Sequence, residues 1–462
     1  MMKIGTSGFR GIIGEDFTKE NVCKIAQATC DILKKYKLKK VVSVGFDNRF
    51  MSEYFARWVA EVLSANDVKV LFFDKAVSSP TISFAGKYFC CPLNLMITAS
   101  HNPYIYNGIK LFSYDGQDLE AYLEKEYTKR VPKVKKYKTI PFEEGIEKGL
   151  IEYVDCMDNF ADTLVSLMKN KPNKKLKIAY NALNGSSVRL AKVVRQKLGL
   201  NFEILNEDRE PTFKFSSPLP NEDKLQEYKE YAITNKLDLA FATDGDGDRV
   251  GVFDEKGNYY AGNELSALIY YYLIKYCGKK GGFVRNYSLS QLSNLVCKTL
   301  GTDIYETKIG FKYIGQTMRN NNALVGAENS GIEILGGAWT KDGMVVFVLL
   351  VDILTYFGKP LSEIFKSLKK EVGYKMHYVE ESFAVKDKQK IVNALTKQTP
   401  NFGVNVSSVE TLDGFKYIFE DGGFALIRFS GTENLLRIVC EENSKKAVKE
   451  IVDNIKRFVN NL

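Results

Sequence analysis

The chain has 462 residues, 45% of them hydrophobic and 26% charged, a composition typical of a globular protein of roughly three or four domains. Its net charge of +9 comes mainly from lysines dispersed among acidic residues, without arginine-rich or aromatic-interleaved tracts, which argues against a nucleic-acid-binding protein. The eight cysteines lack Cys-x-x-Cys spacing and no apolar stretch reaches about 18 residues, so we expect a cytoplasmic protein without a zinc site, a redox pair or a membrane span.

The first 150 residues alternate between helical and strand-like patterns. Apolar side chains recur at helical spacing over 18–36 and again over 52–63, and the run 41–46 between them predicts a buried strand. A second strand-like run covers 93–97. This order of strand, helix and strand predicts a parallel sheet.

The run 93–97 leads into the sequence Thr98-Ala-Ser-His-Asn-Pro103. Pro103 biases the residue before it away from helix, so Ser100 is expected on a constrained loop. A serine-hydrolase triad is not expected, because the chain has only two histidines and no Gly-x-Ser-x-Gly. Taken alone, Ser100 is more typical of a turn residue than of a nucleophile.

The strand-like runs 176–179 and 237–242 continue the pattern, and the second is followed by Asp244-Gly-Asp-Gly-Asp-Arg249. In extended backbone the three aspartates would face the same way, and they would repel one another unless a cation lay between them. Ligands that are all oxygen favour Mg²⁺ or Ca²⁺. An EF-hand is rejected because Arg249 stands where its turn needs glycine, and a dinucleotide site because Val250 replaces the third glycine. An acidic turn without a ligand is the remaining alternative.

The next strand-like runs, 282–284 and 323–325, lead to Gly326-Ala-Glu-Asn-Ser-Gly331. A carboxylate and a hydroxyl on a loop framed by glycines suit vicinal sugar hydroxyls, which donate and accept together. On this chemistry alone, an ordinary loop is the better interpretation of Glu328 and Ser330.

From about residue 372 the pattern changes to short strands at 415–419, 424–429 and 435–439, followed by an amphipathic helix over 447–459. This predicts an α+β module. Ser430-Gly-Thr432 offers two hydroxyls and a flexible backbone to one anion, and two nearby arginines, Arg428 and Arg437, can add forked donors. A surface turn is the alternative.

Together and in this order, the four motifs resemble those of the α-D-phosphohexomutase family, the phosphoglucomutases and phosphomannomutases. The resemblance includes Gly5-Thr-Ser-Gly-Phe-Arg-Gly11, Asn107-Gly-Ile-Lys110 and Gly310-Phe-Lys312, and it spans essentially the whole chain. It implies an α/β fold with three successive α/β domains of related topology, at 1–150, 151–254 and 255–370, and a smaller C-terminal α+β domain at 371–462. These domains would surround a central cleft.

The resemblance also implies an intramolecular phosphotransferase. Such an enzyme would reversibly convert the 1-phosphate and 6-phosphate of glucose or mannose, through a phosphoserine and a hexose 1,6-bisphosphate. Mg²⁺ would be held by Ser100, Asp244, Asp246 and Asp248, and Ser100 would be the phosphoserine. Arg10, His101 and Lys110 would surround the transferring group. The residues expected to bind the sugar phosphate are Arg249, Lys308, Glu328, Ser330, Arg428, Ser430, Gly431, Thr432 and Arg437.

Departures from the family pattern leave more than one sugar as the possible substrate. Ile332 stands where many phosphomannomutase-type members have histidine, Ala327 where glycine is usual, and Asn329 where phosphoglucosamine mutases have glutamine. Gly310-Phe-Lys312 favours the phosphoglucomutase-like branches, including those that act on phosphopentoses. Phosphopentomutase, phosphoglucosamine mutase, a metal-dependent sugar-phosphate phosphatase and a silent sugar-phosphate binding protein therefore stay as alternatives. The general base and the oligomeric state are not readable from these motifs.

Overall fold

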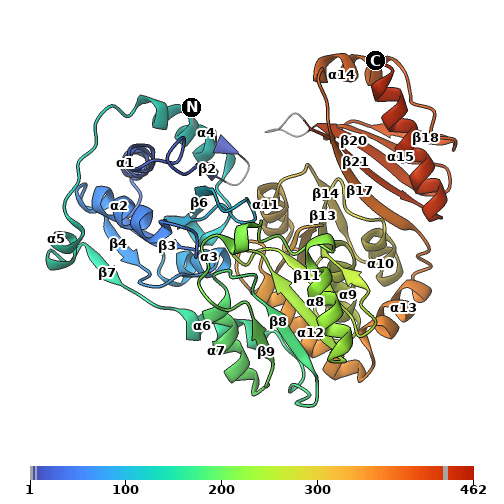
Figure 1. Cartoon of the computed structure of the whole chain (residues 1–462), viewed down its shortest axis with the longest axis horizontal. Helices are drawn as coiled ribbons and strands as arrows, with labels where there is room; N and C mark the ends of the chain where they lie inside the picture. The colour runs from blue at the N-terminus through green and yellow to red at the C-terminus, as the bar shows by residue number, and fades with distance from the viewer. Residues whose placement is uncertain (1–3, 6–7, 430–434) are drawn as a thin grey trace.

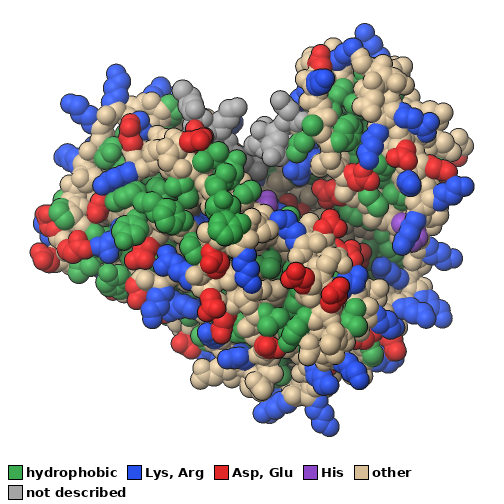
Figure 2. Space-filling view, viewed as in Figure 1, with side chains coloured by type: hydrophobic (Ala, Val, Ile, Leu, Met, Phe, Trp, Pro, Cys, Tyr) green, Lys and Arg blue, Asp and Glu red, His purple; other side chains and the backbone are tan. Residues whose placement is uncertain are grey.

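The computed structural model describes residues 4–5, 8–429 and 435–462, which form four units in chain order. Three α/β units are followed by a smaller unit with one antiparallel sheet (Figure 1). The first and fourth units lie on opposite sides of the molecule, and the surface is hollowed between them (Figure 2). The expected fold, three α/β units and a C-terminal α+β unit, is confirmed.

The first unit is a seven-stranded mixed sheet covered by helices. Its elements are β1 (Ile4–Gly5), β2 (Gly8–Ile12), α1 (Lys19–Lys35), β3 (Val41–Phe46), α2 (Ser52–Ser64), β4 (Lys69–Phe72), α3 (Ser79–Tyr88), β5 (Leu93–Ile97), β6 (Tyr106–Ser113), α4 (Ala121–Arg130), α5 (Phe142–Glu147) and β7 (Ile151–Tyr153). The strand order is β1-β2-β6-β5-β3-β4-β7. Helix α1 begins where the Thr18 hydroxyl caps the backbone N–H of Asn21.

The strands within 41–97 are parallel, as the sequence predicted, but the sheet of the first unit as a whole is only partly parallel. Strands β3, β4, β5 and β7 are parallel, but β6 pairs antiparallel with both β5 and β2. The reason is the length of the connection: residues 98–105 alone join β5 to β6, and a parallel crossover needs a longer segment.

The second and third units repeat this plan. The second contains α6 (Met157–Ser166), β8 (Ile178–Asn181), α7 (Val188–Leu198), β9 (Glu203–Leu205), α8 (Gln226–Thr234), β10 (Leu239–Thr243), β11 (Val250–Phe253) and β12 (Tyr259–Tyr260). The third contains α9 (Gly262–Lys275), β13 (Phe283–Asn286), α10 (Leu292–Leu300), β14 (Ile304–Thr307), α11 (Phe311–Asn321), β15 (Val325–Glu328), β16 (Gly331–Ile334), α12 (Gly343–Phe357) and α13 (Leu361–Glu371). Their sheets have the orders β12-β11-β10-β8-β9 and β14-β13-β15-β16.

In each α/β unit a short loop joins a strand of the parallel set to an antiparallel neighbour. The loops are 98–105 between β5 and β6, 244–249 between β10 and β11, and 329–330 between β15 and β16. Because each loop leaves the carboxyl end of a parallel strand, it lies at the edge where open α/β sheets bind ligands. Three of the four predicted motifs therefore occupy equivalent positions in three units.

The centre of the molecule is packed around α12, which is buried on every side from Gly343 to Leu354. A helix that is apolar all round is stable only when neighbours cover it completely, and α9 is one of those neighbours. Within the described part of the chain, none of the helices alone has the length and apolar character needed to cross a membrane. One pair, α12 and α13, meets that test only when taken together, and a bend of 83° separates the two helices.

The fourth unit is an antiparallel sheet in the order β17-β21-β20-β19-β18. Its elements are β17 (His377–Ala384), α14 (Lys388–Lys397), β18 (Val406–Glu410), β19 (Phe415–Phe419), β20 (Phe424–Phe429), β21 (Leu435–Glu442) and α15 (Lys445–Asn460). One face of the sheet packs on α14 and α15 through residues such as Ile427 and Ile438. Alternation along β20 and β21 places Leu426, Arg428 and Arg437 on the opposite face.

Candidate active site

The loop that carries Ser100 is held in a fixed shape by a buried arginine. Arg49, at the carboxyl end of β3, donates hydrogen bonds to the carbonyls of Ser100 (2.5 Å), Asn102 (2.7 Å), Pro103 (3.0 Å) and Tyr106 (3.0 Å). The Ser100 backbone has φ = 52°, and its N–H donates to Thr98 Oγ1 at 2.8 Å. A serine in this left-handed conformation is strained, and the bonds from Arg49 hold it there.

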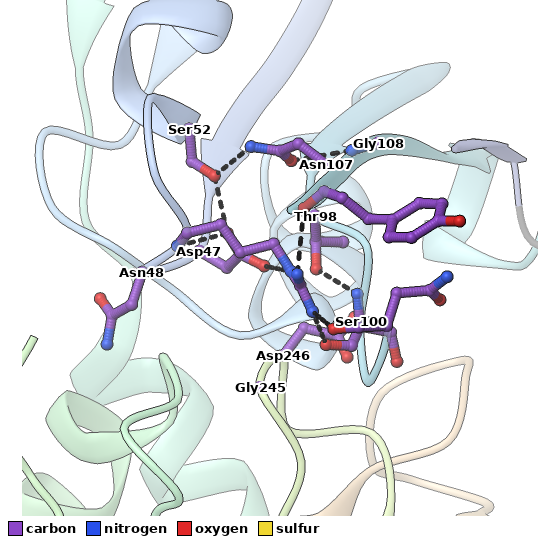
Figure 3. Close-up of polar contacts among 12 residues, drawn as sticks. Asp47, Asn48, Ser52, Thr98, Ser100, Asn107, Gly108, Gly245 and Asp246 are labelled. Atoms are coloured by element: carbon purple, nitrogen blue, oxygen red, sulfur yellow. Dashed lines mark hydrogen bonds and ion pairs between the residues drawn. The ribbon is translucent and has the colours of Figure 1, made fainter. Parts of the chain in front are cut away.

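The Ser100 side chain lies next to the aspartate loop of the second unit. Its Oγ is 2.7 Å from Asp244 Oδ2 and 3.4 Å from His101 Nδ1, and the residue is 1% exposed. Ser79, at the start of α3, bonds Asp246 through both its backbone N–H and its hydroxyl. Figure 3 shows Ser100 close to Gly245 and Asp246, although the two loops are far apart in the sequence. The structure therefore brings the first two motifs together.

The three aspartates converge, but not through extended backbone as the sequence suggested. Asp244 Oδ1 accepts the backbone N–H groups of Asp248 (3.0 Å) and Arg249 (3.1 Å), which curls the loop into a turn. Gly247 takes φ = 78° inside this turn. One oxygen from each aspartate lies within 4.8 Å of the others, and all three residues are buried.

The electrostatics of the aspartate cluster (Asp244, Asp246 and Asp248) are those of a cation site. Asp246 Oδ1 and Asp248 Oδ1 are buried, and no residue in the described part of the chain forms a hydrogen bond with either oxygen. Burial and the two neighbouring carboxylates raise the pKa of Asp244 well above its usual value. For Asp248, burial opposes ionisation, but Lys110, Lys341 and Arg249 outweigh it and lower the pKa. Unpaired oxygens on mutually repelling carboxylates fit a hard divalent ion such as Mg²⁺.

Four basic residues of the sequence prediction surround this cluster. Lys110 Nζ, on β6, is 2.5 Å from one oxygen each of Asp246 and Asp248. Arg10, on β2, donates to Asn102 Oδ1 at 2.7 Å. Burial, with Arg249 and Arg10 nearby, lowers the pKa of His101 well below its usual value, so its imidazole is neutral at neutral pH.

A cavity of about 360 Å³ lies where the second, third and fourth units meet. It is lined by residues from three of the predicted motifs: Arg249, Glu328, Ser330, Arg428 and Arg437. Glu328 Oε1 accepts the Ser330 hydroxyl at 2.6 Å, and the buried Nε of Arg437 has no hydrogen-bond partner among the described residues. Two arginines on one side and a carboxylate with a hydroxyl on the other form a site for a polar, anionic ligand.

Not every predicted residue can be placed at this cavity. Ser430, Gly431 and Thr432 lie outside the described residues. Lys308 is exposed and does not line the cavity, whereas the next residue, Ile309, does.

The sequence motifs missed two residues that hold parts of the site together, Lys341 and Arg49. Lys341 Nζ lies 3.0 Å from Glu328 Oε1 and 4.0 Å from Asp248 Oδ2, so it joins the cavity to the aspartate cluster. The sequence contains little indication of this role, because Lys341 is simply a lysine just before the apolar stretch 343–357. Arg49 had a better signal, because it follows the buried strand run 41–46 within Asp47-Asn-Arg49, where α/β sheets place functional residues.

Comparison with known proteins identifies the family. Four sequence models described as phosphoglucomutase/phosphomannomutase match in order: α/β/α domain I over residues 1–138, domain II over 152–257, domain III over 261–372 and the C-terminal domain over 380–458. The chain belongs to the phosphoglucomutase/phosphomannomutase family. This phosphohexomutase is therefore an enzyme that transfers phosphate within sugar phosphates.

Relatives agree on the family but differ in the sugar that their names state. A phosphoglucomutase/phosphomannomutase of Thermococcus kodakarensis is 28% identical over 97% of this chain and 96% of its own. A phosphoglucosamine mutase of Carboxydothermus hydrogenoformans is 29% identical over 98% of this chain and 97% of its own. A solved phosphoglucomutase/phosphomannomutase family protein of Burkholderia thailandensis, at 22% identity, shares the fold with a TM-score of 0.84 over 99% of this chain and 97% of its own.

Proposed function

We propose that this phosphohexomutase reversibly converts the 1-phosphate and 6-phosphate of glucose or mannose, with Ser100 as the carrier of the phosphoryl group. The observation that carries the proposal is the contact of 2.7 Å between Ser100 Oγ and Asp244. It puts a buried hydroxyl on a cation site, close to a cavity lined by arginines, Glu328 and Ser330. The name of the Thermococcus kodakarensis relative supports these two sugars.

The reaction would run in two half-reactions through the same groups. In the first, the bond between phosphorus and Ser100 Oγ breaks and a bond to the free sugar hydroxyl forms. That hydroxyl gives its proton to a base, for which neutral His101 is available, and Ser100 Oγ takes up a proton. The bisphosphorylated sugar then turns over, and the reverse steps return its other phosphoryl group to Ser100. Protons and phosphoryl groups therefore balance over the cycle.

The proposed metal site consists of Ser100, Asp244, Asp246 and Asp248. When bound, Mg²⁺ would neutralise charge on the transferring phosphoryl group. Arg10 and Lys110 would add positive charge around the same group, because phosphoryl transfer depends mainly on positioning and charge neutralisation.

The proposed anion cradle consists of Arg428 and Arg437 of the fourth unit. It would hold the phosphate that is not reacting, while Glu328 and Ser330 bind the sugar hydroxyls between the two phosphates. Since the bisphosphate must turn over, one cradle would receive either end of it. Enclosure by the third and fourth units would exclude water and protect the phosphoserine from hydrolysis.

A second candidate is phosphoglucosamine mutase, favoured by the name of the Carboxydothermus hydrogenoformans relative. Coupled assays with the 1-phosphates of glucose, mannose, glucosamine and ribose, each started with catalytic bisphosphate, would separate the candidates. Release of free phosphate without an interconverted sugar phosphate would instead select a phosphatase.

Replacement of Ser100 by alanine tests the covalent step. We expect Ser100→Ala to abolish interconversion, and intact-mass measurement to lose one phosphoryl group that the wild-type chain carries after incubation with bisphosphate. Ser64→Ala is the matched control, because Ser64 is a buried serine of the same unit whose hydroxyl has no hydrogen-bond partner in the part of the chain that the structure describes. Turnover of Ser100→Ala within about tenfold of wild type would exclude the phosphoserine.

A further inference from the structure

We propose that Asp413 is a positioning residue for substrate binding: its carboxylate fixes Arg428 of the anion cradle against the loop 308–310 of the third unit. This rests on the proposed function, since it takes Arg428 as a ligand of the sugar's phosphate. Asp413 lies in the turn between β18 and β19, and none of the motifs in the sequence includes it.

The two carboxylate oxygens of Asp413 bond residues of two different units. Oδ1 is 3.1 Å from Arg428 Nε, and Oδ2 accepts the backbone N–H of Ile309 at 2.9 Å. The side chains of Asp413 and Arg428 are 23% and 17% exposed, so the contact is largely shielded from solvent. A charge-assisted bond with this degree of shielding is stronger than an open surface pair.

Arg428 needs such a partner because of its place in the sheet. It lies directly opposite Arg437 in the pairing of β20 with β21, and like charges in facing positions repel. A carboxylate on Arg428 offsets that repulsion and keeps both guanidinium groups on the cavity face. The bond uses one of the five N–H donors of Arg428, so the fork that suits a phosphate stays available to a ligand.

The turn that carries Asp413 is packed tightly onto Arg428. Gly414 has φ = 99°, and a Cβ added there would lie 2.6 Å from the carbonyl oxygen of Ile427 and 3.1 Å from Arg428 Cβ. Only glycine allows this approach, which brings the preceding carboxylate within reach of the arginine. The close packing of this turn therefore places Asp413 beside Arg428.

Ile309, whose backbone bonds the other oxygen of Asp413, also lies at the cavity. Ile309 lines the cavity and packs against the apolar cluster of Tyr287, Phe424, Leu426 and Val439 that joins the third and fourth units. Its loop leads from β14 into α11. Because one carboxylate holds both this loop and Arg428, the distance between the cradle and the third unit is fixed before substrate arrives. Such preorganisation improves binding more than the chemical step.

The decisive experiment is a double-mutant cycle of Asp413→Asn with Arg428→Ala in the whole chain. Kinetics on the preferred sugar phosphate and calorimetric titration with inorganic phosphate are measured for each variant. We expect Asp413→Asn alone to raise KM and weaken phosphate binding about tenfold, with kcat within about threefold. In the Arg428→Ala background the same change should add less than about twofold, because Asp413 acts through Arg428.

Controls separate positioning from folding and from the proposed reaction. Glu420→Gln, a change of an exposed acid in the turn after β19 of the same unit, should alter neither KM nor phosphate affinity. An unchanged KM in Asp413→Asn, or an equal effect with and without Arg428, overturns the inference. If no hexose phosphate is interconverted by wild type but Asp413→Asn still weakens the phosphate binding that depends on Arg428, the proposed function fails and the positioning role stands.

Discussion

At the scale of single residues, the site is a balance of buried charges. Three aspartates and Glu328 are set against Lys110, Lys341 and Arg249, at separations that range from 2.5 to 4.0 Å. A buried charge that loses its partner is costly, so each of these cations stabilises the fold around the candidate site. Lys341 stands out because it contacts both the aspartate cluster and a residue of the cavity.

We predict that Lys341→Met lowers kcat/KM by about 100-fold, because a fixed positive charge between Glu328 and Asp248 would no longer face the anionic ligand. The change keeps an unbranched apolar stem but removes the ammonium, including its contact with the Phe311 ring. Steady-state kinetics would measure it, with Lys359→Met, an exposed lysine of the same unit, as the control. Equal kinetics for the two variants would assign Lys341 no part in the reaction.

Glu333 gives a prediction for the pH dependence of stability. It is fully buried on β16, and within the described ranges neither carboxylate oxygen has a hydrogen-bond partner. Burial, partly opposed by Arg319, raises its pKa to about 8. The unfolded chain releases this proton near pH 4.5, whereas the folded chain keeps it until about pH 8, so stability falls as pH rises between these values.

Ionisation of Glu333 should cost the folded chain on the order of 5 kcal/mol of stability above the folded pKa, and we expect Glu333→Gln to remove this loss. Denaturant unfolding at several pH values from about 5 to 9 would measure it. The wild-type free energy of unfolding should decline over this range, and the variant should decline less and be the more stable of the two at the alkaline end. Parallel curves would show that Glu333 ionises normally in the fold.

At the scale of secondary structure, the chemistry depends on where the α/β units change strand direction. The loops 98–105, 244–249 and 329–330 all leave the carboxyl end of a parallel strand and return antiparallel. The loop 244–249 is also packed against α7 of its own unit: a Cβ on Gly247 would lie 1.9 Å from Ser187 Oγ. Tight packing of this kind fixes the aspartates without a long loop.

We predict that Gly247→Ala destabilises the chain by about 2–4 kcal/mol, because φ = 78° and the contact with Ser187 both exclude a side chain. Thermal unfolding and calorimetric titration with Mg²⁺ would show lower stability and weaker binding. Gly278→Ala is the matched control, since Gly278 also has positive φ (67°) but open space around it. If both variants lose the same amount, backbone strain alone explains the cost and the contact with Ser187 does not matter.

At the scale of the whole molecule, carboxylates attach the fourth unit to the third at separate points. Glu441 on β21 accepts hydrogen bonds from Ser290 Oγ (2.5 Å), Gln291 N (2.7 Å) and Tyr374 OH (2.6 Å). Glu306 on β14 lies 3.0 Å from the buried Lys416 Nζ. The Glu441 contact lies near the segment that connects α13 to β17, so it anchors the fourth unit where the chain enters it.

We predict that Glu441→Ala costs about 2–4 kcal/mol, because it leaves the buried Ser290 and Tyr374 hydroxyls and the partly buried N–H of Gln291 without their acceptor. The fourth unit should then separate more easily, with faster proteolysis between residues 372 and 376 and a lower first transition in calorimetry. Glu450→Ala, a change of an exposed acid on α15 of the same unit, serves as the control. Unchanged cleavage in Glu441→Ala would mean that the apolar cluster around Tyr287 holds the units together without help.

Much of the fold followed from local patterns along the chain. The runs 41–46 and 93–97 became β3 and β5, and the helical spacing over 18–36 became α1, because apolar periodicity reports which face of an element is buried. The run 176–179 ended two residues before the end of β8, and the run 237–242 ended one residue before the end of β10, since polar residues at the ends of buried strands carry no apolar signal. The antiparallel β6 was missed because pairing direction depends on the connection and not on the strand's own residues.

The sequence by itself determined the family, the four units and the four motifs, because residue types and their order are local properties of the chain. Only the tertiary structure decided that Ser100 contacts Asp244, that Lys341 joins the cavity to the aspartate cluster, and that Asp413 bridges two units. Each of these contacts joins residues from different units or from separate segments of one unit, and their meeting depends on how sheets and helices pack. The spacing of residues along the chain does not determine which of them meet in space. The sequence could therefore identify the charged residues of the site but not which acid contacts which base.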